Sequence, residues 1–379
     1  MGDGGPVIVD APLVHLITGV EWRAALAAGS VTPPSLLIEG FIHLSLPQQV
    51  AVPANRLFAG RDDVLLLVVA PDRLGGEVRW EPGAPTDPTS MRFPHLYGPL
   101  PAAAVTSVMP YRPAPGGAYR APEALPATAD PGARAMAFDR SLVERRAAAL
   151  VPVTGGVAAL DPRVRHSHEH NSLWLTGDVA AATIIADADR VLAGCEHRRV
   201  VLDRPPPAEL GWDVQELRVM VLDPGAPTPS GPPGVRVVPV VHEVAARLWE
   251  PMWRRDLPGV TDEVLEHLHR REGIADAHLQ IVNLAVLDDL EEASVPLASA
   301  QLRVDGATAA IEAVMTAPQA RRHGYGHAVV GDAIRRAREA RCDVVFLVAA
   351  ADDWPRGWYE RLGFADIGGR WEATRVMAP

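Results

Sequence analysis

Apolar and polar residues alternate in short runs over about the first 110 residues. The apolar runs are LVHLIT, GFIHLS and VLLLVVA, followed by EVRWE. They are separated by turn-forming residues, and the segment EWRAALAAG between the first two has helical spacing. This pattern predicts an α+β domain with several short strands.

The rest of the chain shows longer elements. In its middle part the pattern predicts a helix over residues 139–149, strands near 156–161 and 172–176, a helix over 179–192 and a strand at 198–202. After residue 235 come VRVVPVV, two amphipathic helices (VHEVAARLWEPMWRRD and TDEVLEHLHRREG), and the strands QIVNLAVL and PLASAQLRV. A further strand, the helix AVVGDAIRRAREA, the strand DVVFLVAAA and a short helix ending in WYERLGF follow.

Two stretches rich in Pro and Gly, PYRPAPGGAYRAPEALPATADPG and DPGAPTPSGPPG, interrupt these elements. Such composition disfavours regular structure and is typical of linkers. We therefore predict domains at residues 1–112, 135–222 and 235–379, with linkers at 113–134 and 223–234.

Composition narrows the class of protein. The 379 residues carry a formal net charge of −11 and no lysine, so a nucleic-acid partner is not expected, since such proteins present basic surfaces. No run approaches the ~20 apolar residues of a spanning helix, and the amino terminus lacks a signal-peptide pattern. Two distant cysteines, Cys195 and Cys342, do not make a disulfide framework. We expect a soluble cytoplasmic protein without a membrane partner.

The segment AAIEAVMTAPQARRHGYG, residues 309–326, carries the most specific chemistry. It predicts a strand that runs into Arg-x-x-Gly-x-Gly, formed by Arg321, Gly324 and Gly326, and then a helix. Glycines at such a turn allow backbone to approach a ligand, and the free N–H groups of the first helical turn attract an anion. With Arg322 adding charge, a pyrophosphate is the expected ligand.

Together with the following strand and the Tyr-x-x-x-Gly-Phe motif, this order resembles the GNAT superfamily of acetyl-CoA-dependent N-acyltransferases. The resemblance covers about the last third of the chain and implies a mixed β-sheet flanked by helices, with acetyl-CoA as cosubstrate and an amine as acceptor. It implies that backbone near Val314 and Thr316 pairs with the pantetheine arm. It also implies that the pyrophosphate is held by Arg321, Arg322, His323, Gly324, Tyr325, Gly326 and His327.

The same resemblance suggests two catalytic residues. Tyr359, four residues before Gly363-Phe364, matches the general acid for the leaving thiolate; the alternative is a tyrosine that packs under the coenzyme. Glu312 matches the general base of part of the superfamily; the alternative is an outward-facing strand residue. Where an asparagine is common, seven residues before the tyrosine, this chain has Asp352, which puts that pantetheine contact in doubt.

Residues 135–222 have the strand–helix–strand order of a GNAT half but no Arg-x-x-Gly-x-Gly motif. They resemble the degenerate amino-terminal half of a tandem GNAT protein. The acceptor is expected to be a small molecule or a peptide amine.

The first domain resembles an uncharacterised bacterial family that is grouped with ADP-ribosyltransferase-like folds. The resemblance covers about residues 13–110, and its His-x-x-Thr and Ile-His-Leu-Ser motifs are similar to those of RNA 2′-phosphotransferases. This implies a pocket for an NAD-like nucleotide at His15, His43 and Ser45, with Glu81 as a further member. The alternative is a structural domain in which these are satisfied core residues.

The sequence RHSHEHN places His166, His168 and His170 at alternate positions, as zinc ligands on a strand would be. No matching second group of ligands follows, so we interpret the stretch as a loop and predict no metal site. Three functions remain: an N-acetyltransferase as the leading hypothesis, a nucleotide-directed transferase of ADP-ribosyl or 2′-phosphotransferase type, or a CoA-binding protein without turnover.

Overall fold

The computed structural model describes residues 11–83, 91–257, 259–288 and 294–377. The chain divides into two compact units. The first comprises residues 1–141 with 305–308 and 340–342, and the second comprises residues 142–304, 309–339 and 343–379. Family resemblance and linker composition predicted the finer domain boundaries, and those boundaries stay predictions.

The first unit contains three small antiparallel sheets. Their strand orders are β1-β4-β8, β2-β7 and β3-β6-β5. The bounds are β1 Leu13–Thr18, β2 Ser30–Val31, β3 Ile42–His43, β4 Val64–Val69, β5 Glu77–Pro82, β6 Arg92–Tyr97, β7 Leu100–Pro101 and β8 Val105–Pro110. All six residues of β4 are buried, as expected for the central strand of its sheet.

Short helices complete this unit: α1 Gly19–Ala28, α2 Pro34–Ile38 and α3 Ala51–Leu57. The sequence determines both ends of α1. The Thr18 side chain accepts from the backbone of Glu21 while Glu21 accepts from the backbone of Thr18, which forms a capping box. At the other end Gly29 has φ +79°, the left-handed conformation that glycine adopts without strain.

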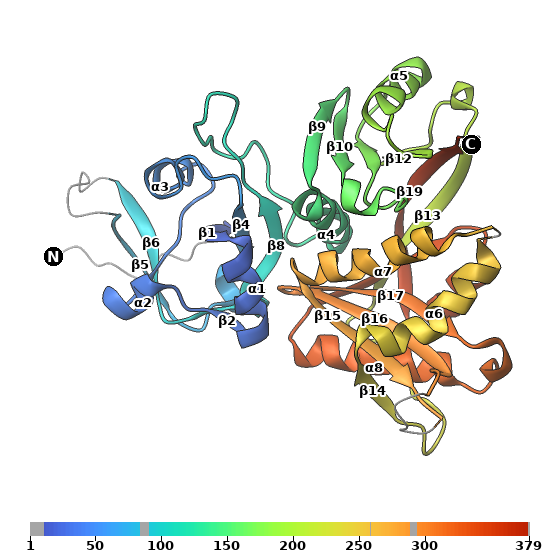
Figure 1. Ribbon diagram of the computed structural model, residues 1–379. Coiled ribbons are helices and arrows are strands. Elements are labelled where there is room, and N and C mark those ends of the chain that lie inside the picture. Colours follow the sequence, from blue (N-terminus) through green and yellow to red (C-terminus); the bar gives the residue numbers. More distant parts are fainter. Residues whose placement is uncertain (1–10, 84–90, 258, 289–293, 378–379) are drawn as a thin grey trace. The chain divides into compact units, whose positions relative to one another are not determined.

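The second unit is built on one long mixed sheet, which runs from β14 at one edge to β9 at the other (Figure 1). The strand order is β14-β15-β16-β17-β18-β13-β19-β12-β11-β10-β9. The bounds are β9 Ala149–Val153, β10 Gly156–Leu160, β11 Ser172–Leu175, β12 His197–Leu202, β13 Asp213–Leu222, β14 Val237–Val240, β15 Gln280–Val286, β16 Ala298–Asp305, β17 Thr308–Thr316, β18 Val344–Ala350 and β19 Phe364–Val376.

The two halves of this sheet exchange strands. β13, which ends the middle part of the chain, pairs antiparallel with β18, and the carboxy-terminal strand β19 lies between β13 and β12. Neither half therefore completes its hydrogen-bonded edge without a strand from the other.

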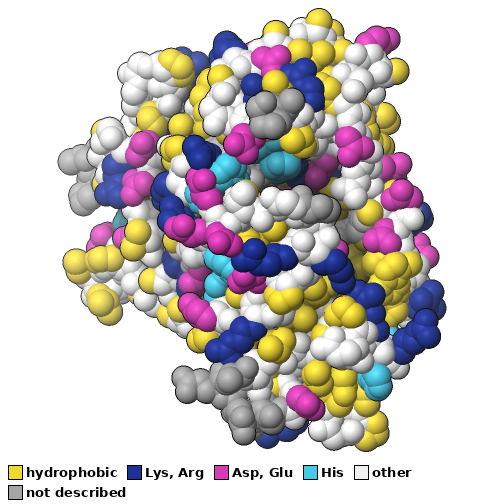
Figure 2. All heavy atoms as spheres, turned by 45° about the vertical axis from the view of Figure 1, so that its right-hand side comes forward, with side chains coloured by type: hydrophobic (Ala, Val, Ile, Leu, Met, Phe, Trp, Pro, Cys, Tyr) yellow, Lys and Arg dark blue, Asp and Glu magenta, His cyan; other side chains and the backbone are white. Residues whose placement is uncertain are grey.

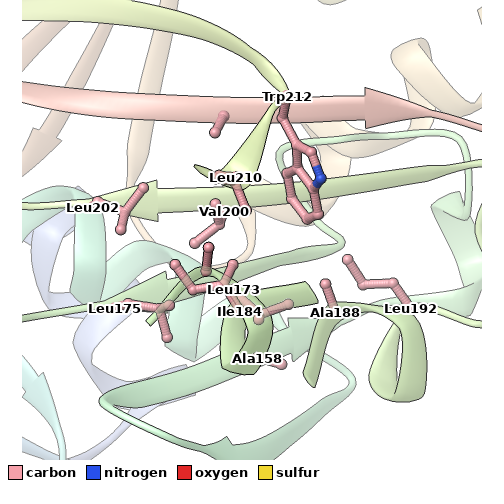
Figure 3. Packing of buried hydrophobic residues seen from close by; sticks show 12 residues of the cluster. Ala158, Leu173, Leu175, Ile184, Ala188, Leu192, Val200, Leu202, Leu210 and Trp212 are labelled. Atoms are coloured by element: carbon pink, nitrogen blue, oxygen red, sulfur yellow. The ribbon is translucent and has the colours of Figure 1, made fainter. Parts of the chain in front are cut away.

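The amino-terminal half of the sheet has its own apolar core under α5 (Ala181–Val191). Leu173, Ile184, Val200 and Trp212 point toward one another there (Figure 3). These residues come from two parallel strands, the helix and the loop before β13. The strand–helix–strand order predicted for this region is confirmed.

The carboxy-terminal half carries α6 His242–Asp256, α7 Asp262–Asp276, α8 Tyr325–Glu339 and α9 Trp354–Arg361. α6, α7 and α8 all pack against β15. Short 3₁₀ helices lie at Pro71–Arg73, Ala102–Ala104, Pro162–Val164, Ala208–Leu210 and Pro318–Ala320. The mixed α+β class predicted from the sequence is confirmed.

The helix predicted over residues 139–149 differs in the structure. α4 spans Pro131–Arg146, and β9 already begins at Ala149. The predicted helix start was too late because residues 130–132, Asp-Pro-Gly, are typical of a turn. Here Asp130 accepts from the backbone N–H of Gly132, and proline is well tolerated in the first helical turn.

Basic and acidic side chains are interspersed on the face that Figure 2 shows. Many form ion pairs along a helix, such as Arg335 with Asp332 and Glu339 on α8. Within the described ranges no helix is both long and apolar enough to cross a bilayer.

Candidate functional site

The turn between β17 and α8 is built as an open, cationic helix start. The short helix Pro318–Ala320 leads into residues 321–324, where Arg322 has φ +66° and Gly324 has φ +78°. These two left-handed residues turn the chain sharply before α8 begins at Tyr325. A 15-residue helix therefore starts directly behind the predicted anion-binding turn.

The arginines of this turn are exposed and available. Arg321, Arg322 and His323 lie on the surface. Arg321 lies close enough to Asp256 for its charge to help lower the pKa of that carboxyl, which is itself bound by Arg255. His323 uses Nδ1 to donate to the carbonyl oxygen of Arg321 at 2.9 Å, which orders the loop. Two exposed guanidinium groups beside a helix amino terminus make an attractive site for phosphate oxygens.

Gly326 and His327, in the first turn of α8, face α9 and the end of β17. A Cβ atom at Gly326 would lie 3.5 Å from the Trp358 ring and 3.6 Å from Oγ1 of Thr316. Trp358 donates from Nε1 to Nε2 of His327 at 3.3 Å. The structure thus brings together Thr316, Gly326 and His327, which the sequence placed in one cofactor site, and adds Trp358, which sequence reasoning missed. Trp358 could have been found from the sequence, because it directly precedes Tyr359, the predicted general acid.

The burial of β17 decreases at Glu312. Residues 308–311 are buried, whereas residues 312–316, including Val314 and Thr316, are half-buried. At the change Ala313 has φ +49°, an uncommon conformation for a residue with a side chain inside a strand. Such irregularities turn backbone and side-chain groups away from a regular ladder and are frequent beside functional sites.

Tyr359 is a buried residue of α9, with 8% of its surface exposed. Its ring packs against Trp358 at 4.9 Å and against Phe364 at 5.9 Å between centroids. Burial raises the pKa of Tyr359 above its ordinary value, and the negative charge of Glu312 raises it further. The two predicted catalytic residues are therefore close enough to influence each other, and the Tyr359 hydroxyl stays protonated across the neutral range.

The second Pro/Gly-rich stretch packs against the face of α8 that carries Gly331. A Cβ atom at Gly331 would lie 2.0 Å from the carbonyl oxygen of Pro229, and one at Gly324 would lie 2.9 Å from Cγ of Pro232. Arg338 donates to the carbonyl oxygen of Ala226 at 2.7 Å. Residues 226–232 therefore form a strap that supports the turn; the sequence indicated only a linker because proline and glycine carry no periodic pattern.

Asp352, where the superfamily has asparagine, is exposed. Its neighbour Asp353 caps α9 by accepting from the backbone N–H of Trp354 at 2.7 Å, and Pro355 occupies the first turn as predicted. Helix capping therefore explains the presence of Asp353 without any ligand.

The first unit contains a cavity of about 770 Å³. Three of the four residues predicted there, His15, His43 and Ser45, line it. Glu81 does not line it; its carboxylate accepts from Nδ1 of His95 at 3.1 Å and from the Tyr97 hydroxyl at 2.9 Å. Nε2 of His95 in turn lies 3.3 Å from Nδ1 of His43. His95 therefore lies between Glu81 and the cavity residue His43.

The alternating histidines lie in a turn and point in different directions. His166 packs against His267, His168 stacks on His197 with centroids 3.9 Å apart, and His170 lies 3.0 Å from the Ser167 hydroxyl. Among the described residues no group of three or more His, Cys, Asp or Glu side chains is placed to hold a metal ion.

Two family models match separate parts of the chain. One, described as "Protein of unknown function (DUF952)", matches residues 16–108, and one described as "Acetyltransferase (GNAT) family" matches residues 246–364. No curated protein matches the chain.

Several solved structures are similar. A functionally unknown conserved protein from Staphylococcus epidermidis is 14% identical, with a TM-score of 0.50 over 60% of this chain and 93% of that one, and shows a shared fold. Protein CC0527 from Caulobacter crescentus is 31% identical over 29% of this chain and 94% of its own, with a TM-score of 0.26. A GCN5-related N-acetyltransferase from Sphaerobacter thermophilus is 14% identical over 98% of both chains, with a TM-score of 0.41.

The GNAT resemblance of the motifs after residue 309 is thereby confirmed, and so is the uncharacterised family at the amino terminus. The chain carries a domain of the acetyltransferase (GNAT) family in its carboxy-terminal part and a domain of a family of unknown function (DUF952) in its amino-terminal part.

Proposed function

We propose that the carboxy-terminal part is an acyl-CoA-dependent N-acyltransferase, with acetyl-CoA as cosubstrate and an amine as acceptor. The observation that carries this proposal is the pairing of an open cationic turn at residues 321–326 with Glu312 and Tyr359. The cosubstrate supplies a thioester whose acyl group is passed to the amine.

The turn fits the diphosphate of coenzyme A. Arg321 and Arg322 offer exposed donors, and Gly326 keeps the helix start free of a side chain beside Thr316 and Trp358. We assign the pantetheine arm to the half-buried end of β17, at Val314 and Thr316. His323, Gly324, Tyr325 and His327 shape the same turn.

Proton movements are assigned to two side chains. Glu312, directly or through a water molecule, accepts a proton from the attacking amine, so that the nitrogen lone pair can form the new C–N bond. Tyr359 donates its hydroxyl proton to the thiolate sulfur as the C–S bond breaks. Its raised pKa keeps the hydroxyl protonated in the resting site, and because this pKa lies above that of an ordinary thiol, near ~8.5, the tyrosinate left by the transfer readily recovers a proton from water.

A second candidate is a nucleotide-directed transferase in the amino-terminal domain, of ADP-ribosyl or 2′-phosphotransferase type and with an ADP-ribosyltransferase-like fold. His15, His43 and Ser45 lining one cavity supports it. The separation of Glu81 from that cavity weakens it, since a carboxylate that stabilises a cationic sugar must face the ligand.

Calorimetry of the full chain with acetyl-CoA, CoA, NAD and ADP-ribose, followed by thiol release from acetyl-CoA with a panel of small and peptide amines, tests these functions. We expect acetyl-CoA binding and amine-dependent thiol release. Binding of acetyl-CoA without turnover on any amine would favour a CoA-binding protein without catalysis. Binding of NAD alone would favour the second candidate and overturn the first.

A further inference from the structure

One side of α9 carries a row of residues that neither the core nor the proton transfers use. Trp354, Gly357, Trp358 and Arg361 stand at positions i, i+3, i+4 and i+7, so they share one side of the helix. Tyr359, which is buried, points to a different side. We call these four residues the α9 flank.

Trp354 is unusually exposed for so large a residue. It keeps 74% of its surface accessible, whereas the eight other tryptophans of the chain, all of which the structure describes, are buried or half-buried. The aromatic ring beside it is that of Trp358, with centroids 6.2 Å apart and an angle of 41° between the planes. An open aromatic face of this kind gains free energy when a flat group covers it.

Gly357 keeps the flank open between Trp354 and Arg361. Glycine weakens a helix interior relative to alanine, and α9 has only eight residues. Packing does not require this glycine, because a Cβ atom there would lie 3.8 Å from Nη1 of Arg361 and close to no other side chain of the described residues. Its effect is to let a ligand approach the helix backbone between the indole and the guanidinium group.

The two ends of the flank differ in charge. The Arg361 side chain is exposed, folds back over Gly357, and has no carboxylate partner among the described residues. The opposite end carries Asp352 and Asp353, both exposed, and their carboxylates repel a phosphate. A phosphate therefore fits the Arg361 end, and an uncharged flat ring fits the Trp354 end.

The middle of the flank adjoins the turn that is proposed to hold the diphosphate. The Trp358 ring lies 3.5 Å from the Cβ position of Gly326, and its Nε1 donates to Nε2 of His327 at 3.3 Å. At a rise of 1.5 Å per residue, Trp354 lies about 6 Å from Trp358 along the helix, and Arg361 lies about 5 Å in the other direction. A ligand that branches next to the diphosphate can therefore reach both ends.

We propose that the α9 flank binds the 3′-phosphoadenosine part of the acyl-CoA donor, an inference that rests on the proposed acyltransferase function. The adenine ring stacks on the indole of Trp354, the ribose lies over Gly357, and Arg361 pairs with the 3′-phosphate. The flank thereby selects a free acyl-CoA over an acyl group carried on phosphopantetheine alone, as a carrier protein presents it.

Calorimetry of the full chain with CoA, dephospho-CoA and 4′-phosphopantetheine tests the two ends separately. Dephospho-CoA lacks the 3′-phosphate, and 4′-phosphopantetheine lacks the adenosine as well. We expect Trp354→Ala to weaken CoA binding about tenfold, the range of one base–aromatic stack, and to leave 4′-phosphopantetheine binding within about twofold. Arg361→Gln should weaken CoA binding about fivefold and leave dephospho-CoA binding within about twofold.

Conservative and remote variants serve as controls. Trp354→Phe keeps a flat ring and should retain CoA affinity within about threefold, whereas Trp354→Leu should resemble the alanine variant. CoA should also quench tryptophan emission more than 4′-phosphopantetheine does, and Trp354→Phe should lose this difference while it keeps its affinity. Leu37→Ala, at an 87% exposed apolar residue, and Arg120→Gln, at an exposed arginine, both in the first unit, should leave CoA affinity unchanged.

The unfolding midpoint of each variant shows that the chain is folded. Unchanged CoA affinity in Trp354→Ala, or equal losses of CoA and 4′-phosphopantetheine affinity, would overturn the inference and leave the acyltransferase assignment in place. So would a Trp354→Leu variant that binds CoA as well as Trp354→Phe does. Failure of the parent chain to bind any of the three ligands would overturn both the inference and the assignment.

Discussion

The long sheet contains two strand–turn–helix units, β11 to α5 and β17 to α8, and their turns carry opposite charge. After β11, the backbone N–H of Gly177 donates to the carboxylate of Asp203 at 3.2 Å, and Arg204 is bound by Asp178 and Asp203. After β17, Arg321 and Arg322 are exposed, and the carboxylate near Arg321, that of Asp256, is already bound by Arg255. One turn supplies its own anion, and the other leaves room for an external one.

This difference explains in physical terms why only one half of the sheet is expected to bind coenzyme A. A phosphate approaching the first turn would meet the carboxylates of Asp178 and Asp203 and would be repelled. The shared strand order provides the scaffold in both halves, whereas a few side chains at the turn determine whether it holds a ligand.

The largest effect is expected from reversing the charge of the second turn. Changing both Arg321 and Arg322 to Glu removes two charge-assisted contacts, each worth about 1.5–3 kcal/mol, so acetyl-CoA affinity should fall roughly 10²- to 10⁴-fold. Calorimetry on the folded chain measures this. Arg204→Glu at the first turn is the matched control and should leave the affinity within about twofold.

Equal losses in both variants would show that long-range charge, rather than the second turn, governs binding. The double variant is a cleaner test than Gly324→Glu. Gly324 has φ +78° and its Cβ would press on Pro232, so that change would disturb the strap as well as the site.

A smaller effect is expected from Tyr359→Phe, which keeps the ring and removes the hydroxyl. Turnover should fall about 10²-fold with unchanged acetyl-CoA affinity, because a proton donor acts mainly as the thiolate leaves. Tyr111→Phe is the control: it also removes a hydroxyl from a buried tyrosine, one that donates to the carbonyl of Arg120 in the first unit, and should leave turnover unchanged.

The pH profile sharpens this test. Since burial and Glu312 raise the pKa of Tyr359, the hydroxyl is protonated at every pH below its ordinary value of 10. The parent chain should therefore show no alkaline decline of turnover from this group up to about pH 10. Full turnover in Tyr359→Phe would mean that water or another group protonates the thiolate.

The motif strand, the glycine turn and α8 could be predicted from the sequence because each combines a periodic pattern with residues that have one physical use. Gly324 adopts positive φ, Pro355 begins a helix, and the apolar face of α8 is continuous. The start of α4 could not be predicted, because Asp130 and Pro131 are as common in turns as at the amino-terminal end of a helix.

Contacts between segments distant in the sequence could not be predicted for a different reason. The insertion of β19 between β13 and β12 depends on which sheet edge is free, and no local pattern carries that information. Likewise only folding places the ring of His95, on β6, between Glu81 and His43.

The smallest expected effect concerns the strap that supports the second turn. Gly331 is buried in α8 with the carbonyl oxygen of Pro229 only 2.0 Å from where a Cβ would lie, a distance that real Cβ atoms do not adopt. Gly331→Ala should therefore displace the strap and lower the free energy of unfolding by about 2 kcal/mol, as overpacking does.

Gly273, an exposed glycine inside α7, is the matched control, because a Cβ there meets nothing within 4 Å. Gly273→Ala should raise the free energy of unfolding by about 0.5–1 kcal/mol, since alanine favours helix over glycine by that amount. Urea unfolding of both variants gives two shifts of opposite sign. If Gly331→Ala also stabilises, helix propensity alone governs both sites and residues 226–232 do not press on α8. If it destabilises and acetyl-CoA affinity falls with it, the strap holds the cationic turn in its binding geometry as well as the helix in place.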